Sequence, residues 1–365
     1  MRRDTMSSAI QRMLAVVATG WIVLLFTAAS PAQAQGRWLK LAPIPDPSEE
    51  IYAVTANGKL YILGGAPVGE GREPGPPRVL VYEYSPATNQ WAKKKPMAVA
   101  SRHIAVAEYR GKIYVFGGEA WAQGGGTNQI LVENSWEYDP AADSWKALAP
   151  MPTIRFAAVA VEVGGKIYVI GGAGHHPGAK DPTARITATT PHRALETNEV
   201  YDPATNRWET RSPMPTARNH AFAGVVGGKV YIIGGQLGGS FTSAASNTDV
   251  VEEYDPTTDS WGVPRARMPT SRSGGAHGTY RGRIYVAGGQ TYDAHLLTAH
   301  RALESYDPAS NQWSILPSMP SPRHGVAGTV IGNRFHLIGG HLSAANTGGP
   351  ALHTDAHDVF EFSDQ

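Results

Sequence analysis

Residues 229–235 read Lys-Val-Tyr-Ile-Ile-Gly-Gly, a short apolar segment that ends in a pair of glycines. Its β-branched and aromatic side chains predict a strand, and the glycines predict a backbone with positive φ or a close approach. The pattern occurs six times, at intervals of 51 to 63 residues, with glycine pairs that begin at Gly64, Gly117, Gly171, Gly234, Gly288 and Gly339. A recurrence with this period indicates a chain built from repeated units.

A tyrosine and a tryptophan mark the second half of each unit. They stand seven residues apart in five units, as Tyr84/Trp91, Tyr138/Trp145, Tyr201/Trp208, Tyr254/Trp261 and Tyr306/Trp313. The residues between them form turn sequences such as Asp139-Pro140-Ala141-Ala142-Asp143. Proline pre-sets such a turn, and aspartate caps it through its side chain. We therefore expect a hairpin here, and a second hairpin at the tight turn before each glycine pair.

Each unit thus predicts four strands, a to d, in an antiparallel sheet. A single sheet of this kind cannot bury both of its faces, whereas six sheets placed radially cover one another and leave only short edges. Six units of the mean length account for nearly all of the 331 residues that follow residue 34. The sequence therefore predicts one all-β domain over residues 35–365.

The two ends of the repeat array complement each other. The sixth unit reaches Phe360-Glu361-Phe362, where the other units have their tyrosine, and too few residues follow for a tryptophan strand. Residues 38–43, Trp-Leu-Lys-Leu-Ala-Pro, match the fourth strand that begins at Trp145. The N-terminal strand is therefore predicted to complete the last sheet and to close the ring.

In the order and spacing of its glycine pairs, tyrosines and tryptophans, the sequence resembles the kelch repeat over residues 38–362. The resemblance implies an all-β, six-bladed kelch β-propeller with four-stranded antiparallel blades. It does not imply a single function, because kelch propellers include adaptors, enzymes and sugar-binding proteins.

The N-terminus has the pattern of an export signal. Arg2 and Arg3 precede an apolar run over residues 13–29, and Ala32-Gln33-Ala34 is a cleavage motif. We expect residues 1–34 to be a cleaved signal peptide, with an uncleaved anchor as the alternative. A periplasmic or secreted protein without a membrane span after cleavage is the resulting prediction.

The composition excludes several classes of function. The formal net charge is +1, and no basic stripe favours nucleic acid as a partner. The chain has no cysteine, so the resemblance to kelch enzymes does not extend to a copper radical oxidase, whose cofactor needs a tyrosine crosslinked to a cysteine. We assign no cofactor and expect a monomer.

Recognition is expected on the face that carries the long loops between strands b and c. An arginine lies near the start of strand a in five units: Arg102, Arg155, Arg218, Arg272 and Arg323. In kelch propellers strand a is innermost, so the resemblance implies that these side chains ring the channel mouth. Guanidinium groups bind carboxylates, which favours an anionic ligand. In the alternative interpretation, the arginines belong to the scaffold and bind backbone carbonyls.

Polar residues beside these arginines extend the candidate site. His103, Asn219 and His324 are predicted to bind ligand, and the first unit is expected to place Glu49 where the others have arginine. If the site is catalytic, Glu49 and His220 are the candidate acid–base residues. A separate pattern, His353, Asp355 and His357, alternates as in a strand and is a candidate metal site, because two histidines and a carboxylate suffice to hold a divalent ion.

Two functions follow from this sequence. The first is a binding module that holds a protein or glycan, with an anionic or carbohydrate ligand, through its long-loop face. The second is a sugar-active enzyme that resembles N-acetylneuraminate mutarotase, an exported six-bladed kelch propeller. The loop sequences favour no particular ligand.

Overall fold

The computed structural model describes residues 36–67, 80–121, 129–175, 192–238, 246–292, 296–344 and 352–363. The predicted signal peptide, residues 1–34, lies outside these ranges. The described residues form strands and turns without a helix, so none of them belongs to a helix of the length and apolar character that crossing a membrane requires.

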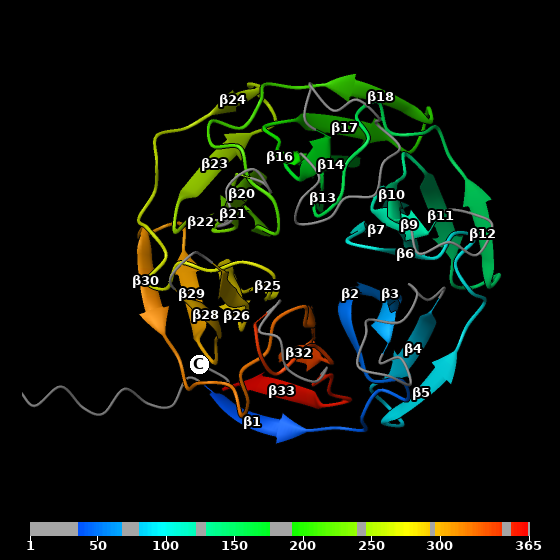
Figure 1. Cartoon of the computed structure of the whole chain (residues 1–365), viewed down its shortest axis with the longest axis vertical. Coiled ribbons are helices and arrows are strands. Elements are labelled where there is room, and N and C mark those ends of the chain that lie inside the picture. The colour runs from blue at the N-terminus through cyan, green and yellow to red at the C-terminus, as the bar shows by residue number, and fades with distance from the viewer. Residues whose placement is uncertain are drawn as a thin grey trace, which may run out of the picture. The chain divides into compact units, whose positions relative to one another are not determined.

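Within these ranges, six four-stranded antiparallel sheets stand around a common axis as the blades of a propeller (Figure 1). Blade 1 consists of β2 (Ser48–Ala56), β3 (Lys59–Pro67), β4 (Val81–Ser85) and β5 (Gln90–Lys93). Blade 2 consists of β7 (Ala105–Tyr109), β8 (Lys112–Phe116), β11 (Ser135–Asp139) and β12 (Ser144–Ala147). Blade 3 consists of β13 (Val159–Val163), β14 (Lys166–Ile170), β17 (Asn198–Asp202) and β18 (Arg207–Thr210).

The other three blades repeat this order of strands. Blade 4 consists of β19 (Phe222–Val226), β20 (Lys229–Ile233), β23 (Val251–Asp255) and β24 (Ser260–Trp261). Blade 5 consists of β25 (Ala276–Tyr280), β26 (Arg283–Ala287), β29 (Leu303–Asp307) and β30 (Gln312–Ile315). Blade 6 consists of β31 (Ala327–Ile331), β32 (Arg334–Ile338), β33 (His357–Phe362) and β1 (Gly36–Lys40).

The last blade joins the two ends of the repeat array, as the sequence predicts. Strand β1 pairs antiparallel with β33, so that Trp38 lies opposite Phe360 and Gly36 lies opposite Phe362. The rings of Trp38 and Phe360 pack edge to face at 5.2 Å between centroids. The propeller is therefore closed by hydrogen bonds between its first and last described strands.

The repeated tyrosines and tryptophans hold neighbouring blades together. Each tyrosine hydroxyl donates to the last residue of its own turn, as from Tyr201 to Asn206. The same Asn206 side chain accepts the backbone N–H of Ala149 in the preceding blade. Each repeat tryptophan donates its indole N–H to a backbone carbonyl of the preceding blade, as Trp208 does to Ala149. Each of these hydrogen bonds contributes about 1 kcal/mol to stability, so the repeated pattern stabilises every contact between neighbouring blades.

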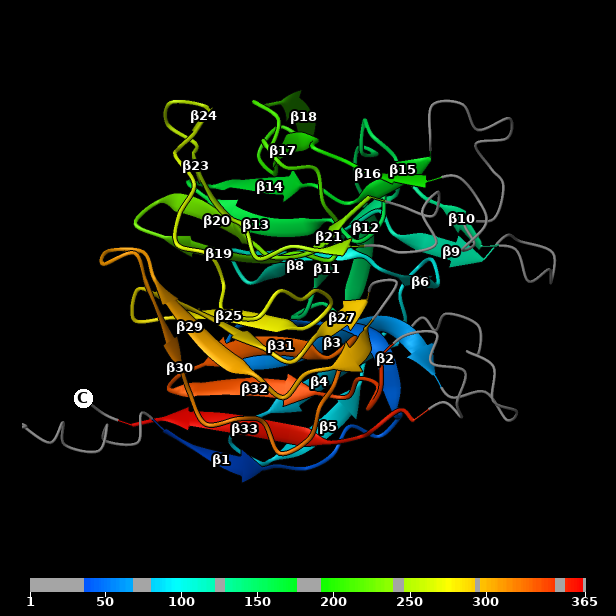
Figure 2. The ribbon, with the colours of Figure 1, turned by 60° about the vertical axis from the view of Figure 1, so that its left-hand side comes forward.

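Short strands lie after the glycine pairs, where the sequence predicts only long loops, and one more, β6 (Ser101–Arg102), precedes the first strand of blade 2. The others are β9 (Glu119–Trp121), β10 (Gln129–Leu131), β15 (Ala173–His175), β16 (His192–Ala194), β21 (Gln236–Leu237), β22 (Ser246–Asn247), β27 (Gln290–Tyr292) and β28 (Leu297–Ala299). They form a three-stranded sheet, β10–β9–β6, and three pairs. In Figure 2, β9, β10, β15 and β16 lie at the same end of the propeller. These strands give the loop face an ordered base.

Candidate functional site

Two rows of residues surround the mouth of the central channel on the loop face. The bridge row pairs through its backbone with the residues that follow each glycine pair, and consists of Glu49, Arg102, Phe156, Asn219, Ser273 and His324. The channel row comes one residue later and consists of Glu50, His103, Ala157, His220, Gly274 and Gly325. The six blades thus deliver equivalent positions to one opening.

The channel row has a left-handed backbone at every position, with φ between 50° and 61°. Its peptide groups bond from blade to blade: the N–H of Ala157 donates to the carbonyl of His103, and His220 donates to Ala157. The series continues from Gly274 to His220, from Gly325 to Gly274 and from Glu50 to Gly325. Glycine adopts this conformation freely, whereas Glu50, His103, Ala157 and His220 adopt it at a cost of about 1–2 kcal/mol each.

The expected ring of five arginines at the mouth is wrong. The side chains of Arg155, Arg218, Arg272 and Arg323 are buried inside their own blades with 0% exposure. Each guanidinium meets an acid on the third strand of its blade, and the pairs are Arg155–Glu199, Arg218–Glu252, Arg272–Glu304 and Arg323–Asp358, at 2.5 to 2.8 Å. Each also donates to backbone carbonyls of its own blade. These four arginines belong to the scaffold, as the alternative interpretation holds.

Arg102 and Glu49 do not occupy the arginine position of the repeat, so that prediction is also wrong. Arg155 is the fourth residue after Met151, and the fourth residue after Met97 is Ser101. Ser48 and Ser101 are buried where the other blades have arginine, and Arg102 and Glu49 follow them in the bridge row. The side chain of Arg102 is therefore not held inside its blade and pairs with Glu119 at the mouth.

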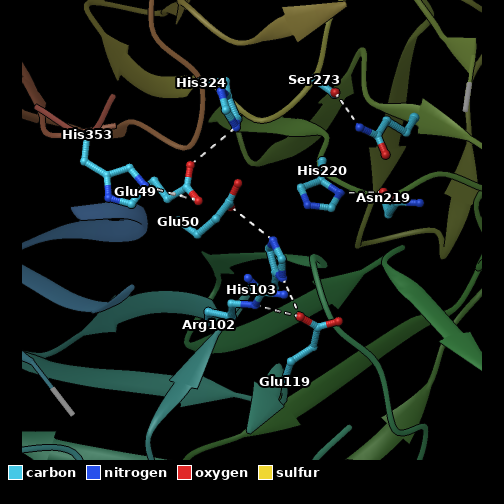
Figure 3. Close-up of polar contacts among 11 residues, drawn as sticks. Glu49, Glu50, Arg102, His103, Glu119, Asn219, His220, Ser273, His324 and His353 are labelled. Atoms are coloured by element: carbon cyan, nitrogen blue, oxygen red, sulfur yellow. Dashed lines mark hydrogen bonds and ion pairs between the residues drawn. The ribbon is translucent and has the colours of Figure 1, made fainter. Parts of the chain in front are cut away.

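Glu50, His103 and Glu119 form a charged group at the mouth, together with Arg102 (Figure 3). The Nδ1 of His103 lies 2.9 Å from Oε2 of Glu119, and its Nε2 lies 3.3 Å from Oε2 of Glu50. Burial lowers the pKa of His103, but the two carboxylates outweigh burial and raise it to about 9. His103 is therefore an imidazolium at neutral pH, and its charge lowers the pKa of Glu50 despite burial.

His220 lies next to this imidazolium and has the opposite protonation state. Its ring packs against that of His103 at 4.9 Å between centroids, and its Nδ1 lies 2.5 Å from Oδ1 of Asn219. Burial, with the charge of His103, lowers the pKa of His220 to about 4. A neutral imidazole and a protonated one therefore stand side by side at the channel mouth.

Glu49 forms a second group with histidines of blade 6. Its two oxygens lie 3.6 Å from Nε2 of His324 and 3.4 Å from Nε2 of His353. His341 packs against both of these rings, at 5.3 Å between centroids in each case. Burial raises the pKa of Glu49, but the hydrogen bond from His353 and the charges of His324 and His353 together outweigh burial, and the pKa is lowered. Glu49 and His220, the two expected acid–base residues, therefore belong to different groups.

The structure does not bring His353, Asp355 and His357 together as a metal site. His353 contacts Glu49, whereas His357 is buried at the start of β33 and bonds to the Ala42 carbonyl and to His336. Among the described residues, two other groups place potential metal ligands within 4.8 Å of one another: Glu49, His324 and His341, and Glu50, His103 and His220. The predicted triad is wrong because His353 contacts Glu49 of blade 1, whereas His357 bonds to His336 of blade 6 and to the Ala42 carbonyl.

Below the mouth, a cavity of about 100 Å³ continues along the channel. Glu50 and His220 lie in its lining, and small residues of the innermost strands such as Ala53, Ala160 and Gly328 form its wall. A cavity of this size is smaller than typical sites for drug-sized molecules. The polar chemistry is therefore concentrated at the mouth.

Comparison with known proteins identifies the repeat. A family model for the KLHDC2/KLHL20/DRC7 Kelch-repeats domain matches residues 188–340, and the Kelch motif model matches residues 154–215. The chain is a kelch-repeat protein. Kelch propellers generally bind other proteins, and at this level the fold supports a protein-binding module.

Similar kelch proteins come from distant organisms. Kelch-like protein terF of Aspergillus terreus is 28% identical over 94% of this chain and 74% of its own length. Kelch-like protein 25 of Xenopus tropicalis is 27% identical over 76% of this chain, which spans only 42% of that relative. The solved structure of YjhT aligns with a TM-score of 0.67 and 18% identity, over 87% of this chain and 95% of YjhT. At this identity, YjhT shares the fold.

Two patterns in the kelch repeat could have located the buried arginines. In blades 3 to 6 an acid stands two residues before the repeat aromatic, as Glu199 does before Tyr201, whereas blades 1 and 2 have Tyr82 and Trp136 there. Arginine and acid therefore occur together in a blade, which indicates an internal pair. Glu119 at the mouth was missed because the sequence predicts only a loop after the glycine pair, although the residue that follows each pair bonds to the bridge row.

Proposed function

We propose that this kelch propeller is an exported binding module that holds a carbohydrate ligand at the mouth of its channel. The observation that supports this is the group of polar side chains that the bridge and channel rows direct to one opening (Figure 3). Hydroxyl groups both donate and accept hydrogen bonds, and the mouth offers carboxylates, a guanidinium, imidazoles and the Asn219 amide. Carbohydrate hydroxyls match this mixture.

The revised charges at the mouth favour a carbohydrate over a strongly anionic ligand. Three carboxylates, those of Glu49, Glu50 and Glu119, face the positive charges of Arg102 and His103. A strongly anionic ligand would need several guanidinium groups at the mouth, but four of the five arginines predicted to lie there are buried in ion pairs. A nearly balanced set of charges suits a ligand rich in hydroxyl groups.

Binding is tested with the purified mature protein and a panel of neutral and acidic glycans, by calorimetry and by saturation-transfer NMR. Arg102→Ala is expected to weaken binding of the best ligand by about tenfold, the loss of one charge-assisted hydrogen bond. Arg207→Ala is the matched control, because Arg207 is exposed on the outer strand β18. Equal effects of the two substitutions, or no glycan bound at all, would refute the proposal.

A second candidate, a sugar mutarotase, is favoured by the neutral His220 beside the protonated His103. Opening and closing a sugar ring needs a proton acceptor and a proton donor, and these two imidazoles provide both. NMR exchange spectroscopy measures anomer interconversion of N-acetylneuraminate with the wild type, Glu49→Gln and His220→Asn. Exchange at the uncatalysed rate with the wild type would exclude this activity.

Export is part of the same proposal and is tested separately. The prediction is that the mature protein begins after Ala34 and is found in the periplasm or the medium. N-terminal sequencing of the protein recovered from each cell fraction decides it. A protein that keeps residues 1–34 in the cytoplasm would contradict export and leave the binding proposal untouched.

A further inference from the structure

The group of Glu50, His103 and His220 has the composition and convergence of a metal site. The potential ligand atoms of these three side chains lie within 4.8 Å of one another, and Oε2 of Glu50 is 3.3 Å from Nε2 of His103. Two ligands that are each about 2.0 Å from a zinc ion stand about 3.3 Å apart at the tetrahedral angle. The Glu50–His103 spacing already fits, and a small rotation of His220 completes the set.

Both histidines have an oxygen partner on the nitrogen that points away from this centre. Nδ1 of His103 bonds to the Glu119 carboxylate, and Nδ1 of His220 bonds to the Asn219 side-chain oxygen (Figure 3). An oxygen acceptor on Nδ1 holds the proton there and directs the lone pair of Nε2 to the opposite side. Histidines that bind metals have this arrangement, with a carboxylate or carbonyl behind each ring.

We propose that Glu50, His103 and His220 bind a divalent transition-metal ion, with Glu119 and Asn219 as the residues that orient the two imidazoles. Two imidazoles and one carboxylate leave coordination positions open toward the channel, which suits Zn²⁺ or Fe²⁺. The ion would replace a proton between Glu50 and His103. The site shares His103 and His220 with the mutarotase candidate, so a bound ion would exclude the acid–base roles proposed there for these two imidazoles.

The backbone of the channel row fixes the positions from which the three proposed ligands extend. Gly274 and Gly325 occupy this row in blades 5 and 6, where the left-handed conformation carries no penalty. Glu50, His103 and His220 adopt the same conformation with φ of 50° to 53° and bear the strain. Ala157 has the same conformation, and the bonds from blade to blade hold the whole row in it, so the three side chains start from fixed backbone positions.

The neighbouring group of Glu49, His324 and His341 is a weaker candidate. Nδ1 of His341 already bonds to the Ser343 carbonyl, and its Nε2 accepts the backbone N–H of Leu352. A metal ion there would have to displace one of these bonds. His103 and His220 lose no bond to the backbone on binding an ion, so the first group is favoured.

The test uses untagged full-length protein stripped with chelator. Calorimetry with Zn²⁺, visible spectroscopy with Co²⁺ and elemental analysis measure affinity, coordination and stoichiometry. We expect one ion per chain, and a weakening of more than 100-fold in Glu50→Gln and in His220→Gly. His220→Gly is chosen because glycine at this position in blades 5 and 6 shows that the backbone tolerates it. Circular dichroism confirms that each variant is folded.

Two further variants separate this site from its alternatives. His324→Ala alters the second group at the same mouth and is expected to leave Zn²⁺ affinity unchanged. Asn219→Leu removes only the acceptor behind His220 and is expected to weaken binding 10- to 100-fold. Absence of a bound ion in the wild type, or loss of binding in His324→Ala with retention in His220→Gly, would overturn the proposal.

Discussion

The buried pair of Arg272 and Glu304 allows a quantitative test of the scaffold role of the arginines. Nη1 of Arg272 lies 2.6 Å from Oε2 of Glu304, and the two side chains are 0% and 3% exposed. The other oxygen of Glu304 accepts the hydroxyl of Thr270 at 2.6 Å. Glu304→Gln keeps the shape of the side chain and one hydrogen-bond acceptor, but it leaves the guanidinium charge of Arg272 without a counterion inside the blade.

Removal of one partner of a buried pair costs about 3–5 kcal/mol. Because glutamine retains a hydrogen-bond acceptor, we expect Glu304→Gln to lower the free energy of unfolding by about 3 kcal/mol. That is a large part of the 5–15 kcal/mol typical of a folded domain. Urea unfolding followed by tryptophan fluorescence measures the change.

The protein itself supplies a compensating substitution. Blade 1 has Ser48 and Tyr82 at the positions of Arg272 and Glu304, so the double variant Arg272→Ser/Glu304→Tyr copies an arrangement that another blade uses. We expect it to be more stable than the sum of the two single effects predicts, by about 2 kcal/mol. Glu209→Gln, in an exposed ion pair, is the control and should cost less than about 1 kcal/mol. Equal costs at Glu209 and Glu304, or strict additivity of the double variant, would refute the reasoning.

Three other predictions test the ring, the channel row and the buried histidines. Trp38→Ala removes the indole N–H bond to the Pro317 carbonyl and the packing on Phe360. Denaturant titration should show that the free energy of unfolding falls by about 2 kcal/mol. An unchanged value would contradict closure of the ring by β1. Gly325→Ala places a Cβ 2.8 Å from the backbone nitrogen of Glu50, on a residue whose backbone is left-handed. The same assay should show that the free energy of unfolding falls by about 2 kcal/mol. No change would contradict the strain assigned to the channel row. Burial and the charge of His357 lower the pKa of His336 to about 3, and burial lowers the pKa of His357 to about 4. Below pH 6.5 the unfolded chain therefore binds more protons than the folded chain, so the free energy of unfolding falls as the pH falls. At pH 5 each histidine lowers the free energy of unfolding by about 2 kcal/mol. His336→Phe should therefore reduce the slope of the free energy of unfolding against pH between about pH 5 and 6. An unaltered slope would show that the two histidines do not have these lowered pKa values.

The fold can be predicted from the sequence because the same pattern of strand and turn residues occurs six times. Glycine pairs, turn residues and the Tyr–Trp spacing each predict the same strands. A strand whose bounds are ambiguous in one unit can therefore be placed by comparison with the other units. The match between residues 38–43 and the strand at Trp145 was sufficient to place β1 in the last blade. Local patterns and ring closure therefore agree.

The site is harder to predict because a shift of one residue along the chain exchanges buried and exposed positions. Arg102 and Arg155 look equivalent in sequence, yet Ser101 holds the buried place and Arg102 reaches the mouth. The partner of an arginine also decides its role, and the acid that binds Arg155, Glu199, lies 44 residues away. Glu119 joins the mouth through the pairing of β9 with β6. The same pairing follows every glycine pair, but the residue at this position differs from blade to blade, so the repeat alone does not mark Glu119 as a site residue.

The pairing of β1 with β33 has a consequence for folding during synthesis. Arg37 and its partner Glu361 are 324 residues apart, so the first strand leaves the ribosome long before its neighbour is made. Early blades have all of their own strands nearby and can form while the remainder is still being translated. The segment from Gly36 to Lys40 must meanwhile wait unpaired, where proteases and other growing chains have access to it. We therefore expect ring closure to be the last step of assembly, and a delay in translation late in the message to prolong the time during which β1 has no partner.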